Sequence, residues 1–185
     1  RWLDIAVRCP AGAGGYTALA PRQPVTPAPY AITSPGSPYQ NVVIAAKSGG
    51  DFTSIQSALD SITDASDTNR YLVWIAPGVY TETVTMKQFV DLEGAGELVT
   101  KVTFTGSASA NTGTLVGANN AELRFLTVEN TGGANHAIAI YNSSAWPRLT
   151  HLTASASGGT FSFGVFNSSS SPTMTNVTAS ASGGT

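Results

Sequence analysis

The chain contains a tandem repeat of 25 residues. Residues 136–160 align without a gap with residues 161–185, and the segment TASASGGT closes both copies. A repeat of this length is typical of a solenoid, in which each copy forms one coil and buries its apolar side only by stacking on its neighbours. The repeat therefore restricts the chain to architectures made of stacked coils.

Each copy consists of short strands and turns. In residues 136–141 and 161–166, successive side chains would point to opposite faces of a strand. Their β-branched and aromatic members also favour a strand. An Asn-Ser-Ser segment leading to Pro147 or Pro172 interrupts this strand, and a second strand and a glycine-rich turn follow. The copies lack a helical pattern, so each copy predicts one coil of a β-solenoid.

Stacked coils place equivalent residues above one another, about 4.8 Å apart. We therefore expect Ile138 to lie on Phe163 and Leu149 on Met174, in one apolar column. Asn142 over Asn167 would form an amide ladder. An antiparallel hairpin array is the alternative, but the turns lack the Asn-Gly or Asp-Gly pair that favours two-residue hairpins.

Charged residues make up only 11% of the chain, and the net charge is −2. After Glu129 the one formally charged side chain is Arg148, so the surface there consists of Ser, Thr, Asn and Gly. This composition favours an extracellular or cell-surface location and excludes the basic footprint of nucleic-acid binding. No segment is long enough for a membrane span, and Cys9 has no second cysteine to pair with. We interpret Cys9 as an incidental buried thiol.

Residues 1–38 are predicted to form an extended arm with a proline-rich linker, followed by a β-helix domain over residues 39–185. Residues 1–8 alternate like a strand without a nearby partner, and residues 21–38 are rich in proline. The chain starts without methionine or a signal peptide, so we expect it to be a processed piece of a longer secreted protein.

One helix is expected near residues 53–62, because apolar residues recur at helical spacing. Thr53 and Gln56 fit a capping box at its start. We expect this helix to cover the open end of the solenoid. Its apolar stripe consists of Phe52, Ile55, Ala58, Leu59 and Ile62.

Three segments carry a resemblance to a known superfamily: residues 42–62, 71–84 and 90–104. They resemble the start of the pectin methylesterase and pectate-lyase-like right-handed parallel β-helices. The matching positions are Asp51-Phe52, Ile55-Gln56, Ala58, Pro77–Tyr80, Glu82, Leu92, Gly94 and Gly96. The resemblance implies a right-handed, single-stranded parallel β-helix with about 25 residues per coil and an N-terminal capping α-helix.

The resemblance implies catalytic residues that the sequence does not supply. Esterases of this superfamily use two aspartates, an arginine and glutamines on later coils, whereas its lyases need a calcium-binding acidic cluster and a basic residue. This chain has no Asp or Glu after Glu129. We therefore assign no catalytic, metal or cofactor residue.

The first hypothesis is a non-enzymatic extracellular β-solenoid: a structural, adhesive or filament-forming module that self-associates through the solenoid end or the N-terminal arm. The alternatives are a polysaccharide-acting enzyme of the pectinesterase or pectate-lyase kind and a passive carbohydrate-binding module. An acidic cluster assembled in a groove by the early coils would argue against the first hypothesis.

Several acidic side chains are candidates for a site. Asp91 and Glu93 share one strand face and could act as acid and base or bind a cation, although solvation opposite buried Val90 and Leu92 is the simpler interpretation. Glu82 is interpreted as a structural hydrogen-bond acceptor. A third group, consisting of Asp60, Asp64 and Asp67, lacks the spacing of a calcium loop and is interpreted as a solvated helix end and loop.

Four ring-bearing side chains are further candidates. His136 and His151 occupy variable coil positions, and a two-histidine metal site would lack an evident third ligand. Tyr141 and Phe166 are expected to stack on an outer face, as a sugar platform or an interface. Glycosylation patterns begin at Asn142, Asn167 and Asn176, and they arise easily by chance in a chain rich in Ser, Thr and Asn.

Overall fold

The computed structural model describes residues 39, 41–105, 109–132 and 135–183, together with the backbone of four short strands near the N-terminus. The chain divides into two compact units, Arg1–Ser37 and Pro38–Thr185. In the described part of the chain, no helix has the length and apolar character that crossing a membrane requires. Cys9 and most of the proline-rich segment lie outside the described residues.

The first unit contains two short antiparallel pairs. Strand β1 (Trp2–Leu3) pairs with β4 (Gln23–Pro24), and β2 (Ala6–Val7) pairs with β3 (Thr17–Ala18). The prediction that the strand within residues 1–8 has no nearby partner is therefore wrong. Both partner strands come from the predicted extended arm, and β4 comes from its proline-rich part.

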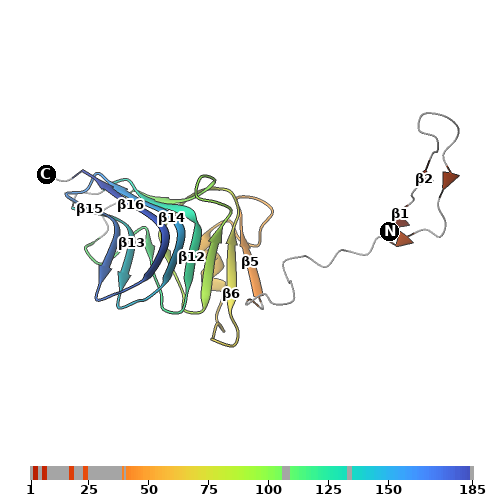
Figure 1. Cartoon of the computed structure of the whole chain (residues 1–185), viewed down its shortest axis with the longest axis horizontal. Coiled ribbons are helices and arrows are strands. Elements are labelled where there is room, and N and C mark those ends of the chain that lie inside the picture. Colours follow the sequence, from red (N-terminus) through yellow and green to blue (C-terminus); the bar gives the residue numbers. More distant parts are fainter. Residues whose placement is uncertain are drawn as a thin grey trace. The chain divides into compact units, whose positions relative to one another are not determined.

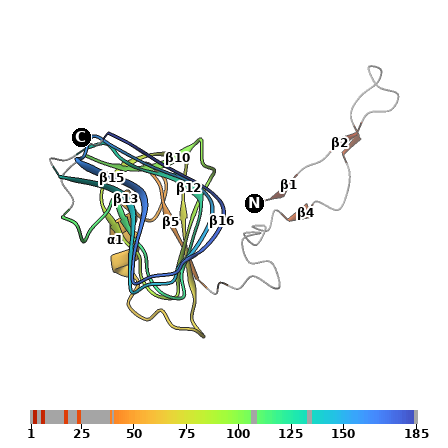
Figure 2. The same cartoon turned by 60° about the vertical axis from the view of Figure 1, so that its left-hand side comes forward.

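The second unit is a parallel β-helix (Figures 1 and 2). Its larger sheet has the strand order β16-β14-β12-β9-β6-β5, with β7 and β10 attached through β12. All pairings in this sheet are parallel. The strands are β5 (Asn41–Ala45), β6 (Tyr71–Ile75), β7 (Gly78–Thr81), β9 (Val90–Gly94), β10 (Thr100–Phe104), β12 (Glu122–Asn130), β14 (Arg148–Ser157) and β16 (Thr173–Ser182).

The smaller sheet has four strands in the order β15-β13-β11-β8. These strands are β8 (Val84–Thr85), β11 (Leu115–Val116), β13 (His136–Ser143) and β15 (Phe161–Ser168), and they too pair in parallel. The predicted register is confirmed: Ile138 pairs with Phe163 and Asn142 with Asn167. The parallel β-helix prediction is thus correct.

The core is a column of aliphatic side chains that continues from coil to coil. Val73 pairs with Leu92, Leu92 with Leu123, and Leu123 with Leu149, and all four are fully buried. Burying one such side chain stabilises a fold by about 1.5–3 kcal/mol. Because each coil contributes to the same column, the column fixes the register of the polar residues on the opposite strand face.

Helix α1 (Ile55–Ser61) packs against β5, β6 and β8, with Ile55, Ala58 and Leu59 buried. Its N-cap is Ser54, whose side chain accepts a hydrogen bond from the Ser57 amide. The predicted capping box of Thr53 and Gln56 is therefore wrong: the Gln56 side chain instead accepts a hydrogen bond from the Thr85 amide at 2.8 Å.

Glu82 replaces the capping box at the start of α1. Its carboxylate accepts hydrogen bonds from the Ser54 hydroxyl at 2.7 Å and from the Ile55 and Gln56 amides, both at 3.0 Å. A carboxylate is favourable there because the first amides of a helix lack intrahelical partners and carry partial positive charge. The structural interpretation of Glu82 is confirmed.

Candidate functional site

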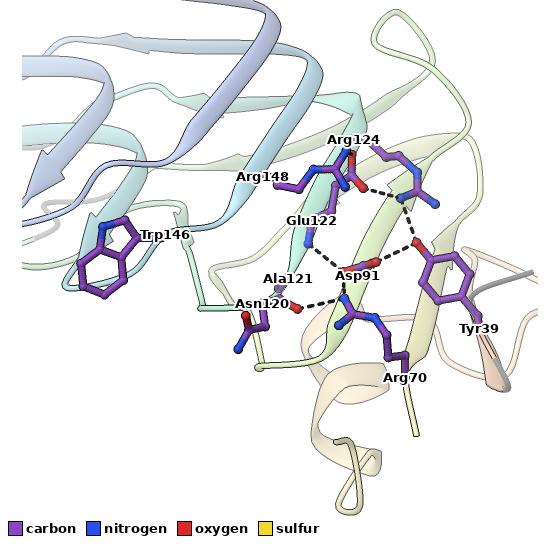
Figure 3. A pocket seen from close by; sticks show the side chains of 9 residues that line it. All are labelled: Tyr39, Arg70, Asp91, Asn120, Ala121, Glu122, Arg124, Trp146 and Arg148. Atoms are coloured by element: carbon purple, nitrogen blue, oxygen red, sulfur yellow. Dashed lines mark hydrogen bonds and ion pairs between the residues drawn. The ribbon is translucent and has the colours of Figure 1, made fainter. Parts of the chain in front are cut away.

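A pocket of about 610 Å³ opens on the outer face of the larger sheet. Parallel strands begin at the same end of a sheet, so residues at the starts of β6, β9, β12 and β14 meet there. Figure 3 shows their side chains converging from separate coils. The lining residues are Tyr39, Arg70, Asp91, Asn120, Ala121, Glu122, Arg124, Trp146 and Arg148.

Asp91 is the central acceptor of the pocket. Its carboxylate accepts hydrogen bonds from the Tyr39 hydroxyl at 2.7 Å, the Glu122 amide at 2.7 Å and the Arg70 guanidinium at 3.2 Å. Only 4% of the residue is exposed. The prediction of a solvated Asp91 is wrong, because neighbouring coils cover the outward face of β9 with cationic and hydroxyl groups.

Arg124 connects the remaining acidic groups. Its Nε and Nη2 donate to Glu93 at 2.8 and 2.6 Å, and its Nη1 donates to Glu122 at 3.0 Å and to Tyr39 at 2.9 Å. Burial alone would lower the pKa of the Arg124 guanidinium, but its hydrogen bonds to Tyr39 and Glu93 outweigh burial and raise it. Arg124 therefore stays charged, and it links β9 and β12 to the segment before β5.

Tyr39 is held between the two charged groups. Burial, and then the hydrogen bond to Asp91, raise the pKa of the Tyr39 phenol from 10.0 to about 12. The phenol thus stays protonated and donates to the carboxylate throughout the neutral range.

A Tyr39→Phe substitution should reveal this protonation. Up to about pH 10 the phenol is protonated in both the folded and the unfolded chain, so the stabilisation that it provides is constant. Between about pH 10 and pH 12 the unfolded chain loses the proton first, and the free energy of unfolding falls. In urea titrations from pH 8 to pH 12, the difference in the free energy of unfolding between wild type and variant should stay constant up to about pH 10 and then decrease. A difference that remains constant to pH 12 would contradict the assigned pKa shift.

The opposite side of the pocket is more accessible. Trp146 is 53% exposed, and the Arg148 side chain is 68% exposed. Arg148 faces Glu122 at 3.6 Å, a longer contact than the 2.6 Å between Arg124 and Glu93. The pocket thus combines an internally paired, buried network with an accessible guanidinium and indole, a combination that suits an anionic ligand with an apolar face.

The two histidines make ring contacts on different strands. His136 on β13 stacks on Phe161 at 5.3 Å, and His151 on β14 stacks on Phe125 at 5.0 Å. His151 also forms a hydrogen bond with Asn176 at 2.9 Å. The described residues include no group of three or more His, Cys, Asp or Glu side chains that could hold a metal ion.

Tyr141 stacks on Phe166 at 5.8 Å, as predicted, but Tyr141 is only 5% exposed. The prediction of an outer-face sugar platform at Tyr141 is therefore wrong. Asn142 is fully buried and donates to Asn167 at 2.8 Å, which confirms the amide ladder and makes Asn142 inaccessible to glycosylation in the folded chain.

Among the residues of the pocket, the sequence analysis singles out only Asp91 as a candidate site residue. It misses the other members of the network and the exposed indole, which are Tyr39, Arg70, Glu122, Arg124 and Trp146. Arg124 carried a usable signal, because it lies two residues after Glu122 on a strand and must share its face. Tyr39 carried none, since it follows the proline-rich segment and meets Arg124 across 85 residues of sequence.

Taken together, the fold and the pocket define a parallel β-helix with a polar, mixed-charge site on its larger sheet. A model of the pectinesterase family matches residues 41–153. This match covers more than half of the chain, so the chain belongs to the pectinesterase family.

Individual relatives agree with this assignment. A protein of Arabidopsis thaliana described as "Probable pectinesterase/pectinesterase inhibitor 17" is 31% identical over 126 residues, which cover 63% of this chain and 24% of that protein. A crystal structure of a pectin methylesterase in complex with a hexasaccharide matches 65% of this chain and 47% of its own, with 16% identity and a TM-score of 0.51. The chain therefore spans about a quarter of the curated relative and about half of the solved structure, and the structural likeness shows the fold alone.

The family match overturns the hypothesis of a non-enzymatic structural, adhesive or filament-forming module. That hypothesis relied on the lack of acidic residues after Glu129. However, the early coils bring Asp91, Glu93 and Glu122 together beside a pocket, which is the arrangement that would argue against it. The assignment of no catalytic residue stays a prediction.

Proposed function

We propose that the protein is an extracellular carbohydrate esterase that hydrolyses the methyl esters of pectin. The observation that carries the proposal is the pectinesterase family match over residues 41–153, which includes α1 and every strand of the larger sheet except β16 and the end of β14. Hydrolysis adds water to the ester carbonyl, breaks the bond to the methoxy oxygen and yields methanol, a galacturonate carboxylate and a proton.

The geometry of the larger sheet supports a polysaccharide substrate. Successive coils present a continuous outer face on which an extended sugar chain could lie, and the pocket interrupts this face beside Trp146. Exposed indole rings present an apolar surface and guanidinium groups present fixed donor pairs, so this part of the pocket suits a sugar ring and its acidic substituent. An extracellular location agrees with the low charge content of the chain.

The test is the release of methanol from highly methyl-esterified pectin by the purified chain. Methanol should rise in proportion to protein concentration, with one acid group released for each methanol. De-esterified polygalacturonate and heat-unfolded protein serve as controls and should release none. A folded sample, verified by circular dichroism, that releases no methanol above the unfolded control would contradict the proposal.

A further inference from the structure

We propose that the edge formed by the last two strands, β15 and β16, is a docking surface for a second copy of this chain. In the proposed dimer, the β16 strands of the two copies pair antiparallel across a two-fold axis at Ala179. The larger sheets of the two copies thereby join into one sheet. This inference does not depend on the proposed esterase activity, because it rests on the strand edges alone.

The two ends of the β-helix differ in how their strand edges are covered. β5 and β16 are the outermost strands of the larger sheet and lie at its opposite ends (Figure 1). At the β5 end, the Asp51 and Phe52 amides donate to the Ile44 carbonyl oxygen at 2.9 and 3.1 Å, and the Ile44 amide donates to the Asp51 carboxylate at 2.8 Å. Helix α1 packs on the same strand. This end is therefore closed by a turn and a helix of the chain itself.

The β16 end is open in the part of the chain that the structure describes. There β16 pairs only with β14, and β15 pairs only with β13. The ten residues of β16 and the eight residues of β15 thus present an edge of backbone donors and acceptors without a partner strand. An edge of this length is a template for another strand, because a further strand supplies the missing hydrogen-bond partners.

The repeat shows what a strand covering this edge would bury. Leu149 and Ala154 on β14 are fully buried, with β16 stacked on them. Their equivalents one coil later, Met174 and Ala179, are exposed, and Met174 is 50% exposed. Phe161 on β15 is likewise 55% exposed. Covering the edge would therefore remove apolar side chains from water, which favours association.

The chemistry of the edge favours a second copy as the occupant. Residues 149–185 contain no Asp, Glu, Lys or Arg, so two identical edges meet without like-charge repulsion. β16 also lacks the proline and the inward-pointing charge by which natural edge strands avoid one another. A surface that meets itself across a two-fold axis closes after two copies. Since the β5 end is covered, the association stops at a dimer and does not continue as a filament.

The alternation of side chains along β16 determines the register of the pair. Val177 packs against the core, and Ala179 and Ala181 lie on the same strand face because they follow at a spacing of two. With the axis at Ala179, Val177 lies opposite Ala181 of the partner subunit, so the apolar faces of both copies coincide. A shift by one residue would place the apolar face of one copy beside the hydroxyl face of the other.

Light scattering and cysteine cross-linking test the dimer. The chain should have twice its monomer mass at about 100 μM and should dissociate on dilution. In a Cys9→Ser background, Ala179→Cys should give a disulfide-linked dimer under mild oxidation, because directly opposite residues of an antiparallel pair lie about 4.5–5.5 Å apart. Thr173→Cys lies on the same strand but away from the axis, and it should remain without a cross-link.

Two lysine variants separate the edge from unspecific effects. Ala179→Lys places two like charges at the axis and should raise the dissociation constant of the dimer at least about tenfold. Ala95→Lys adds the same charge at an exposed position after β9, away from the edge, and should change the constant by less than about twofold. Circular dichroism verifies that both variants are folded.

Four results would each overturn the proposed dimer. They are a monomer at every concentration, growth beyond the dimer, equal cross-linking of Thr173→Cys and Ala179→Cys, and an equal effect of the two lysine variants. Because the readouts are mass and cross-linking rather than methanol release, the dimer and the proposed esterase activity can fail separately.

Discussion

Asp91→Ala is expected to lower the free energy of unfolding by about 3–5 kcal/mol, the range for removing one partner of a buried charged network. The substitution would leave the Tyr39 hydroxyl, the Glu122 amide and one Arg70 donor without the acceptor they share. The Arg70 charge would also lose its ion pair at the edge of the pocket. Urea denaturation at pH 7, followed by circular dichroism, measures the loss.

Two further variants make the Asp91 experiment specific. Asp91→Asn keeps the shape and one good acceptor but loses the charge, so it should be destabilised by less than Asp91→Ala. Asp60→Ala removes an exposed carboxylate on α1 and should alter stability by no more than about 0.5 kcal/mol. If Asp91→Ala behaved like Asp60→Ala, the hydrogen-bond network would contribute nothing measurable to the fold.

Gly94→Ala is the second substitution with a large expected effect, about 3 kcal/mol, at the upper end of the range for overpacking. A Cβ atom at this position would lie 2.4 Å from the Phe125 carbonyl oxygen and 2.7 Å from the Leu126 Cβ. The first of these is backbone in the next coil, so it cannot move aside without breaking the stacking of β9 and β12.

The control for Gly94 is its neighbour Ala95, which is exposed. Ala95→Ser should stay within about 0.5 kcal/mol of wild type, while Gly94→Ala should unfold at distinctly lower urea concentration. Wild-type-like stability of Gly94→Ala would mean that adjacent coils are spaced more widely than this structure has them.

The fold was predictable because the period of the repeat determines it. A gapless spacing of 25 residues places Ile138 on Phe163, and the observed register has this pair. The glycine at the end of β9 has an equally simple cause, since the next coil leaves no room for a side chain at Gly94. Both features can be seen in the sequence itself, as a repeated segment and as a glycine at a fixed place in a motif.

The site was less predictable because its contacts join residues that no local pattern relates. Glu82 reaches the start of α1 across 28 residues, and Tyr39 reaches Asp91 across 52. Alternation predicted correctly that Asp91 points away from the core, but it could not predict that Arg70 and Tyr39 would cover it. Tyr141 is the reverse case, because the same alternation indicated exposure for a residue that is buried.

The prediction of a non-enzymatic structural module is wrong for one reason. The family resemblance implies catalytic aspartates on later coils, and the absence of Asp and Glu after Glu129 therefore indicates a structural module. Parallel stacking, however, aligns the starts of β6, β9, β12 and β14, so residues of the early coils share one pocket with Trp146 and Arg148 of a later coil. The family match over residues 41–153 then corrected the inference.

The most direct test of the proposed activity is a proton NMR time course of the purified chain with a fully methyl-esterified oligogalacturonate. The esterase proposal predicts that the ester methyl signal declines while the methanol signal grows by the same integral. A spectrum in which the ester signal stays constant, from protein that is folded by circular dichroism, would contradict the proposed catalysis.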